Sequence, residues 1–317
     1  MPIEESKYVW MNGAMISWHD GNVHFLNPGM QYGCAVFEGI RAYSTEKGTC
    51  IFRLTEHVER LFNSARVLSI EIPFSREEIE EAIIKTVRDN GLKDCCYIRP
   101  TVWKGYDHMG LDQREAPVEI GIGAFHWEPY ISQSGIRVKI SNTQKNSSWA
   151  VPTTAKICGP YANSLIAKQD ARASGFDEAI LLNDRGFVAE ATAQNVFAVN
   201  ENCVRTPPEN ADILMGITRD SALTLGKELG YNMKEGDLAV EDLFDANEVF
   251  LTGTASEVAP VIEIGKTKIG DGTAGPVTLK LQKRYADTVR GKVPEHIDWL
   301  TPVEEERKRE KVYLSLS

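Results

Sequence analysis

Two side chains of this chain have the chemistry that a covalently bound aldehyde cofactor requires. Lys156 ends the segment Val151–Lys156, and Glu190 follows further along the chain in the segment Gly186–Asn195. A lysine amine can form a Schiff base with an aldehyde, and a carboxylate can hold a pyridine nitrogen in its protonated form. Because most lysines are solvated surface charges, the assignment depends on what else the chain supplies.

A phosphate on such a cofactor needs backbone N–H groups at a helix N-terminus, hydroxyl donors and a cation. The stretch Met215–Asp220 predicts one such terminus, where Gly216 permits close approach and Thr218 is expected to cap the helix that follows. The loop Leu251–Ser256 offers further hydroxyls, and Arg60 offers a guanidinium. Together these groups predict a phosphate site.

Other chemistries are poorly supported. The sequence has no HExxH, GxSxG or P-loop motif, no Rossmann fingerprint, and no histidines or cysteines at metal-ligand spacing. The net charge of −10 and the pI near 5.2 disfavour a nucleic-acid partner. The acidic N-terminus does not resemble a secretory signal, and no apolar run reaches membrane-spanning length. We therefore expect a cytoplasmic protein without a metal or a membrane partner.

The residue patterns predict a mixed α+β chain. Asn12-Gly13 between two apolar runs predicts a β-hairpin over residues 8–16. Ser75 with Glu78 forms a capping-box pattern at the start of a helix. Helices are expected at about 55–69, 75–91, 161–174, 218–229 and 276–290, and strands at 96–99, 119–125, 138–141, 179–182, 187–189, 196–199 and 249–251. The pattern loosens after residue 130, which predicts an interdomain linker over 131–136 between a domain of residues 1–130 and one of 137–317.

Seven segments together resemble one family, in order along nearly the whole chain. They are Tyr32–Tyr43, Glu56–Leu61, Tyr97–Pro100, Pro152–Lys156, Gly186–Asn195, Gly216–Asp220 and Thr252–Ala255. The family is the class IV (fold type IV) pyridoxal-phosphate enzymes, and within it the branched-chain amino acid aminotransferases. The resemblance implies a two-domain fold type IV enzyme with a smaller N-terminal α/β domain and a larger, β-rich C-terminal α/β domain that carries the lysine.

The resemblance also implies roles for individual residues. Pyridoxal 5'-phosphate would form its Schiff base with Lys156, the catalytic residue, and the other residues expected at the cofactor are Arg60, Tyr161, Glu190, Leu214, Ile217, Thr218 and Thr254. Those expected at the substrate are Phe37, Tyr97, Arg99, Trp127, Tyr130, Thr254 and Ala255, with Tyr161 also beside the side-chain pocket. Tyr32 and Leu111 would reach in from a partner subunit, which implies at least a homodimer.

The implied reaction is transfer of the amino group of leucine, isoleucine or valine to 2-oxoglutarate by a ping-pong mechanism. Arg99 would pair with the γ-carboxylate of the second substrate. The chain departs from the family pattern at Cys158, Pro160, Ala191 and Gln194, which flank the cofactor and bear on substrate preference. A D-amino acid or (R)-amine transaminase, an aminodeoxychorismate lyase of the same fold and a non-catalytic relative are the alternatives.

Overall fold

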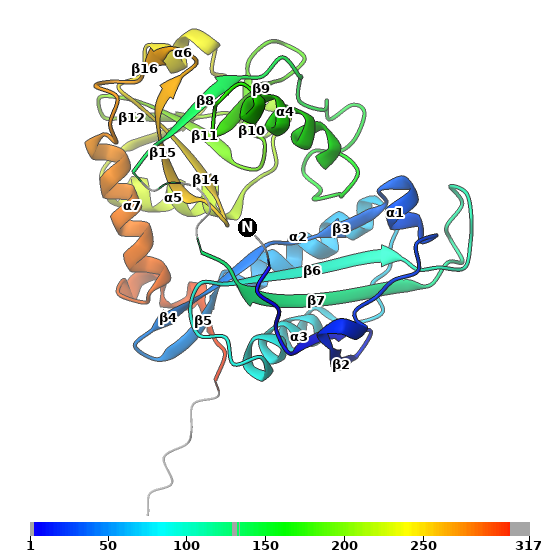
Figure 1. Cartoon of the computed structure of the whole chain (residues 1–317). Coiled ribbons are helices and arrows are strands. Elements are labelled where there is room, and N and C mark those ends of the chain that lie inside the picture. The colour runs from blue at the N-terminus through cyan, green and yellow to red at the C-terminus, as the bar shows by residue number, and fades with distance from the viewer. Residues whose placement is uncertain (1–2, 129–131, 133, 305–317) are drawn as a thin grey trace, which may run out of the picture.

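Two β-sheets form the framework of the protein. The computed structural model describes residues 3–128, 132 and 134–304, and Figure 1 shows one sheet above the other with α7 (Pro276–Val289) running along one side. The first sheet is built from the N-terminal part of the chain and one late strand, and the second from residues 136 to 268. This arrangement agrees with the expected α+β class.

The first sheet has the order β17-β5-β4-β6-β7-β1-β2, with β3 also paired to β6. Its N-terminal hairpin forms as predicted, because Asn12 and Gly13 take the positive φ values of 50° and 99° that a tight turn requires. The strands are β1 (Tyr8–Met11), β2 (Ala14–Ser17), β3 (Ala35–Phe37), β4 (Ile40–Thr45), β5 (Gly48–Phe52), β6 (Cys96–Lys104), β7 (Val118–His126) and β17 (Leu300–Pro302).

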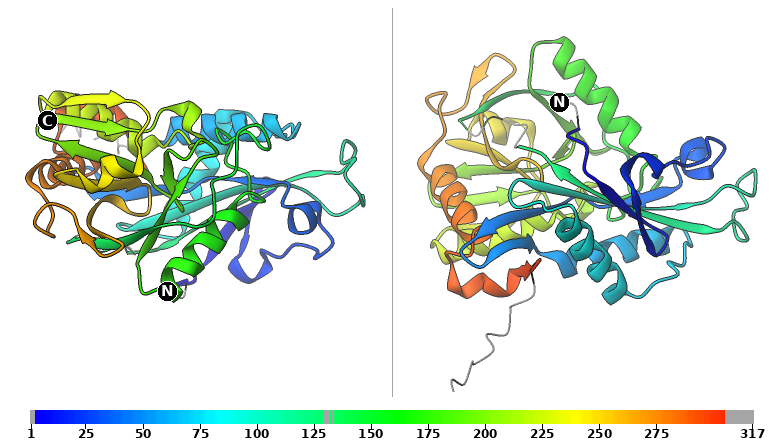
Figure 2. Two further views of the ribbon diagram at one scale, coloured as in Figure 1. Left: turned by 90° about the horizontal axis from the view of Figure 1, so that it is seen from above. Right: turned by 60° about the horizontal axis from the view of Figure 1, so that its bottom comes forward.

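Two amphipathic helices pack against this sheet, α2 (Leu54–Val67) and α3 (Arg76–Asp89), as Figure 2 shows. The Ser75 hydroxyl accepts from the Glu78 N–H while the Glu78 carboxylate accepts from the Ser75 N–H, so the predicted capping box is confirmed. A short helix, α1 (Pro28–Tyr32), follows the hairpin and a 3-10 turn, η1 (Trp18–Asp20). The apolar faces of α2 and α3 bury the first core against the sheet.

The second sheet has the order β10-β9-β8-β15-β14-β11-β12-β13, with β16 paired to β15. Its strands are β8 (Ile136–Ile140), β9 (Glu178–Leu182), β10 (Val188–Ala191), β11 (Asn195–Asn200), β12 (Cys203–Thr206), β13 (Asn232–Glu235), β14 (Glu248–Gly253), β15 (Glu257–Ile264) and β16 (Thr267–Lys268). Most pairs are antiparallel, whereas β8 runs parallel to both β9 and β15, and β12 runs parallel to β13.

Helices cover parts of this second sheet. α4 (Tyr161–Ala173) packs on β9, and α5 (Ile217–Glu228) packs with α7 on β14. α6 (Val240–Phe244), η2 (Glu209–Ala211) and η3 (Pro294–Trp299) complete the elements. The expected helix ends agree within two residues, but the prediction that Thr218 caps α5 is wrong. Gly216 is the N-cap and Thr218 lies inside the first turn, because Ile217 already has helical backbone angles.

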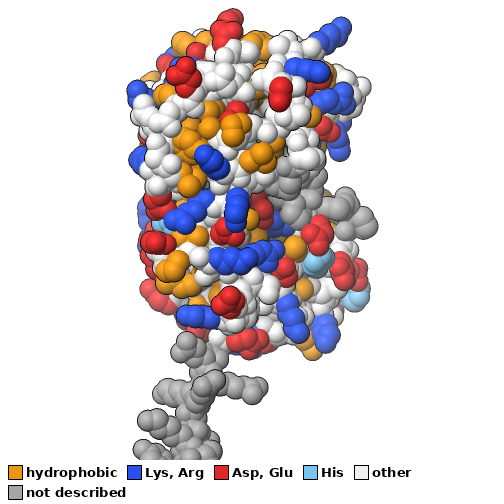
Figure 3. All heavy atoms as spheres, turned by 90° about the vertical axis from the view of Figure 1, so that its left-hand side faces the viewer, with side chains coloured by type: hydrophobic (Ala, Val, Ile, Leu, Met, Phe, Trp, Pro, Cys, Tyr) orange, Lys and Arg blue, Asp and Glu red, His pale blue; other side chains and the backbone are white. Residues whose placement is uncertain are grey.

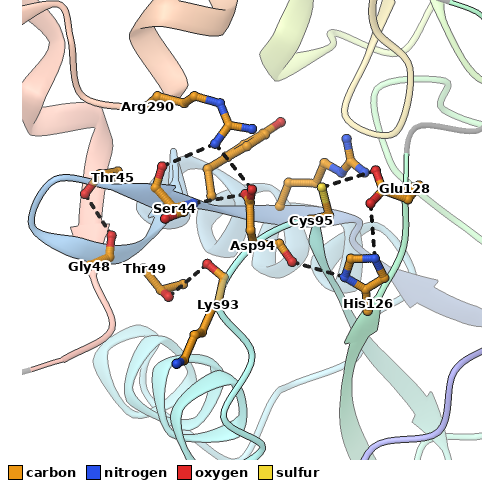
Figure 4. Close-up of polar contacts among 12 residues, drawn as sticks. Ser44, Thr45, Gly48, Thr49, Lys93, Asp94, Cys95, His126, Glu128 and Arg290 are labelled. Carbon is orange, nitrogen blue, oxygen red and sulfur yellow. Dashed lines mark hydrogen bonds and ion pairs between the residues drawn. The ribbon is translucent and has the colours of Figure 1, made fainter.

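The last part of the chain returns to the first sheet. Arg290, just after α7, donates to the Ser44 carbonyl and to the Asp94 carboxylate, as Figure 4 shows, and β17 then pairs with β5. The chain therefore returns from the second sheet to an edge of the first, while the domain limits at residues 130 and 137 stay a prediction. Among the described residues, no helix is both long and apolar enough to cross a membrane, and no cluster of potential metal ligands occurs.

Candidate active site

The segment that carries Lys156 is fixed to the first sheet, although it lies between β8 and α4 in the sequence. The Phe37 N–H donates to the Lys156 carbonyl (3.1 Å), and Val36 forms an antiparallel bridge with Ile157. The Cys158 N–H donates to the Ala35 carbonyl (2.8 Å). These backbone bonds, with one from the Lys156 N–H to the Ser64 hydroxyl (2.9 Å), place the lysine between the two sheets.

The Lys156 amine lies in a buried aromatic setting. Its Nζ donates to the Tyr161 hydroxyl at 2.6 Å and lies 4.8 Å from the centre of the Phe37 ring. Burial, followed by the positive charge of Arg60, lowers the pKa of Lys156 from 10.5 to about 8. Burial also raises the pKa of Tyr161. Roughly a tenth of Lys156 is therefore a neutral nucleophile at pH 7.

Glu190 lines the same cavity and is held on both oxygens. Its Oε2 accepts from the Asn195 side chain (3.1 Å) and from the Leu214 N–H (3.1 Å), and its Oε1 pairs with Lys145 Nζ at 2.7 Å. Burial alone would lower the pKa of Lys145, but attraction to Glu190 outweighs it and raises that pKa. The result is a fixed buried carboxylate that can face a protonated ring nitrogen.

The same cavity also has the groups of an anion site. The first N–H groups of α5, at Ile217 and Thr218, have no partner within the helix and carry its positive dipole end. Thr252 Oγ1 lines the same cavity, is buried and has no hydrogen-bond partner in the described part of the chain. A Cβ at Gly216 would lie 2.1 Å from Asn195 Oδ1, so any larger residue there would displace the Asn195 side chain.

Arg60 adds the cation and is itself held by a buried carboxylate. Arg60 Nε and Nη2 donate to the two oxygens of Glu38 at 2.6 and 2.9 Å, and its Nη1 donates to the Met215 carbonyl. His57 Nδ1 lies 2.8 Å from Glu38 Oε2. Despite burial, Arg60 and His57 hold the pKa of Glu38 far below its usual range. The bidentate pair fixes the guanidinium at the cavity wall.

A second compartment opens on the other side of Lys156 and is walled by aromatic rings. Arg99 lies over the rings of Phe37 (4.8 Å) and Tyr97 (5.3 Å), and its Nη2 donates to the Tyr97 hydroxyl at 3.0 Å. Trp127 meets Tyr97 edge to face. Arg99 Nε is buried without a partner among the described residues. This compartment can hold an apolar group and, through Arg99, an anionic one.

The structure brings nearly all the sequence-predicted residues together. All eight expected cofactor residues line one cavity: Arg60, Lys156, Tyr161, Glu190, Leu214, Ile217, Thr218 and Thr254. Six expected substrate residues line the adjoining compartment: Phe37, Tyr97, Arg99, Trp127, Thr254 and Ala255. Tyr32 and Leu111 lie elsewhere, together in another surface pocket, and Tyr130 lies outside the described residues.

Sequence reasoning missed several residues of this site. Lys145, Asn195 and Glu38 each hold a predicted residue in place, whereas Thr252 belongs to the loop from which hydroxyls were expected. The Glu38 and Asn195 positions lie within segments singled out for the family resemblance, so these two carried a signal. Lys145 carried none, because it reaches Glu190 only after β8 and β9 have paired.

The residues present fit a cofactor with an anionic group at one end and a protonated ring nitrogen at the other. Known proteins are similar to this chain along nearly its whole length. The amino-transferase class IV model matches residues 35–264. A branched-chain-amino-acid aminotransferase of Pseudomonas aeruginosa is 42% identical over 93% of this chain and 97% of its own.

Solved structures are equally similar. A T.th. branched-chain amino acid aminotransferase with pyridoxamine 5'-phosphate has a TM-score of 0.92 at 43% identity, covering 95% of this chain and 99% of its own. The same protein complexed with N-(5'-phosphopyridoxyl)-L-glutamate has a TM-score of 0.90, with the same identity and coverage.

Proposed function

Because this chain belongs to the class IV aminotransferases and, within them, to the branched-chain-amino-acid aminotransferases, we propose that it transfers the amino group of leucine, isoleucine or valine to 2-oxoglutarate. The observation that carries the proposal is the position of Lys156. Its amine, whose pKa is lowered to about 8, lies between an anion site at Thr218 and an aromatic compartment that contains Arg99.

Pyridoxal 5'-phosphate, when bound, supplies an aldehyde for Lys156 and a ring that withdraws electrons from the substrate α-carbon. Glu190 would hold the ring nitrogen protonated, while Arg60, Thr218, Thr254 and the α5 terminus would bind the phosphate. Tyr161 and Leu214 would position the ring. Once displaced, Lys156 moves a proton at the substrate α-carbon, acting as base and then as acid.

The adjoining compartment supports two kinds of substrate in turn. Phe37, Tyr97 and Trp127 provide apolar surface for a branched side chain. Arg99 lies at this wall, and its Nε has no hydrogen-bond partner among the described residues. A γ-carboxylate is the group that this donor would pair with. Tyr97 and the Thr254-Ala255 turn would receive the α-carboxylate. One site that accepts both substrates in alternation implies a ping-pong mechanism, and the glutamate adduct of the T.th. relative supports glutamate as the second amino acid.

The test uses the loaded protein and one substrate at a time. Leucine without any 2-oxo acid should bleach the visible absorbance of the bound cofactor and release one equivalent of 4-methyl-2-oxopentanoate. Added 2-oxoglutarate should then restore the absorbance. Lys156→Ala should abolish turnover. A Lys156→Ala variant with the wild-type spectrum and full turnover would overturn the role of this residue.

A donor panel separates the alternatives. Faster reaction of D-alanine or an (R)-amine than of L-leucine would indicate a transaminase of different specificity. Release of pyruvate from aminodeoxychorismate would indicate a lyase, and absence of any amine-induced spectral change would indicate a non-catalytic protein.

We also propose a homodimer. Leu111 is 83% exposed and Met30 70% exposed, and the Gly110 N–H donates to the Tyr32 hydroxyl, so apolar side chains of two segments lie together on the surface. A second copy that covers them would bring Tyr32 and Leu111 towards its own substrate compartment.

A further inference from the structure

A fully buried carboxylate lies at the start of β9, outside the site described above. Glu178 is the first residue of this strand and is 0% exposed, whereas the residues that follow it in β9 are apolar. It lines neither the cofactor cavity nor the adjoining compartment. Because a buried carboxylate without partners strongly destabilises a fold, the partners of Glu178 indicate its role.

One partner of Glu178 belongs to the wall of the cofactor cavity. The Thr192 hydroxyl donates to Glu178 Oε1 at 2.6 Å, and the Ala179 N–H donates to the same oxygen at 2.8 Å. Thr192 is 6% exposed and lines the cavity. A short hydrogen bond to a charged acceptor, with both groups buried, is among the stronger bonds of a protein. Glu178 therefore fixes one residue of the cavity wall.

Thr192 lies in the turn that joins β10 to β11. The Ala191 N–H donates to the Gln194 carbonyl at 2.7 Å and closes this turn, and Glu190 is paired in register with Asn195 across the two strands. The three residues that follow Ala191 all line the cavity. A shift of the turn would therefore move the cavity wall and change how Asn195 holds Glu190.

The other oxygen of Glu178 is bound from α4, which packs on β9 as Figure 1 shows. Lys168 Nζ, on α4, lies 2.7 Å from Glu178 Oε2. The same helix begins at Tyr161, whose hydroxyl accepts from Lys156 Nζ. Glu178 thus connects the helix that carries Tyr161 with the turn that follows Glu190.

We propose that Glu178 is a positioning residue that holds the β10–β11 turn in the shape that the bound cofactor requires, through its hydrogen bond with Thr192. The inference rests on the proposed function for the identity of the cofactor. Its distinguishing feature is that the accepting oxygen matters more than the charge. Thr192 needs only an acceptor, whereas Lys168 needs a carboxylate.

Variants at both ends of the bond test this role by equilibrium dialysis of pyridoxal 5'-phosphate. Thr192→Val removes the hydroxyl and Glu178→Leu removes the acceptor, so each should raise the dissociation constant by about tenfold, the loss of one buried charge-assisted hydrogen bond. The double variant should bind no more weakly than either single variant, because all three lack the same bond. Thr192→Ser and Glu178→Gln retain the bond and should stay within about threefold of the wild type.

A direct contact between Thr192 and the cofactor gives a different pattern. Thr192→Val would then weaken binding while Glu178→Leu would not, and this outcome would overturn the role of Glu178. If Glu178→Leu does not fold, Glu178→Gln decides. Its acceptor is uncharged, so Thr192→Val should cost less affinity in this background than in the wild type. An equal cost in both backgrounds would also overturn the role.

Glu248→Leu is the matched control. Glu248 also begins a strand of the second sheet, β14, is 6% exposed, and accepts from the N–H groups of Val277 and Thr278. Glu248→Leu should lower the melting temperature about as much as Glu178→Leu and leave the cofactor affinity unchanged. Equal cofactor affinities in these two variants would show that Glu178 serves stability alone.

Failure of the proposed function has a separate signature. That function is judged by leucine turnover in the unmodified protein, whereas the role of Glu178 is judged by a dissociation constant that requires no turnover. Wild-type turnover with unchanged cofactor affinity in Glu178→Leu and Thr192→Val refutes only the positioning role. Absent wild-type turnover, with cofactor affinity weakened in both variants, refutes only the function.

Discussion

Lys156 shows how burial turns an ordinary side chain into a reactive one. An exposed lysine near neutral pH is almost entirely protonated, whereas a pKa of about 8 leaves roughly a tenth of Lys156 neutral at pH 7. The lowered pKa also makes the protonated amine a destabilising group in the folded chain. The contribution of Lys156 to the free energy of unfolding therefore rises with pH between about 8 and 10.5, where the unfolded chain binds more protons.

The first prediction follows from this pKa. The rate at which cofactor-free protein captures pyridoxal 5'-phosphate should rise about tenfold per pH unit below pH 7 and level off above about 8. Stopped-flow absorbance over pH 6 to 10.5 measures it. A rate that keeps rising to pH 10 would show an unperturbed lysine and contradict the burial argument.

The second prediction concerns Glu38, which neutralises Arg60. Glu38→Gln leaves a buried guanidinium without its carboxylate, so the cofactor-free protein should lose about 3 to 5 kcal/mol of stability. Inorganic phosphate, which brings a negative charge to Arg60, should raise the melting temperature of this variant more than that of the wild type. Thermal unfolding with and without phosphate measures both effects.

Glu59→Gln is the control for this prediction. Glu59 lies on the same helix, α2, and forms a half-exposed ion pair with Arg76. Its loss should change stability by less than about 1 kcal/mol, with or without phosphate. Equal phosphate responses in Glu38→Gln and Glu59→Gln would show that Glu38 does not set the charge of the phosphate site.

At the scale of elements, the N-cap of α5, Gly216, links the anion site to Glu190. A Cβ at Gly216 would displace Asn195, whose side-chain amide donates to both Glu190 and the Leu214 carbonyl. Gly216→Ala should therefore weaken cofactor binding by at least about tenfold, since both the helix terminus and Glu190 shift. Equilibrium dialysis with absorbance detection measures the affinity.

Gly236→Ala is the matched glycine control, because a Cβ there meets nothing within 4 Å. It should leave the cofactor affinity at the wild-type value. Comparable affinities in Gly216→Ala and Gly236→Ala would mean that Asn195 can move without cost.

The same elements show what the sequence could predict. Apolar periodicity and local caps predicted α2, α3, α4, α5 and α7 and most central strands, because those signals lie within each segment. The lysine proposed as catalytic and the residues around it were predicted from segments whose residue types matter chemically. The core that Tyr43 and Tyr285 share was not predictable, because β4 and α7 lie far apart in the sequence and meet only in the folded chain.

At the scale of the whole molecule, two faces differ in character. Figure 3 shows lysine and arginine side chains mixed with acidic ones on the face that carries α7. The end of the molecule near α1 instead exposes large apolar side chains, among them Phe25, Met30, Met109 and Leu111. Mixed charge favours contact with water, and clustered apolar surface favours contact with protein. The proposed second copy therefore belongs at the α1 end.

The last prediction tests that placement. Leu111→Glu puts a charge into the apolar surface and should shift the protein from dimer to monomer in light scattering. It should also remove leucine turnover, because Tyr32 and Leu111 would no longer reach the partner's compartment. Leu279→Glu, on the charged face of α7, changes an equally large apolar side chain and should leave both mass and turnover unchanged. A fully active monomeric Leu111→Glu variant would show that each chain completes its own site.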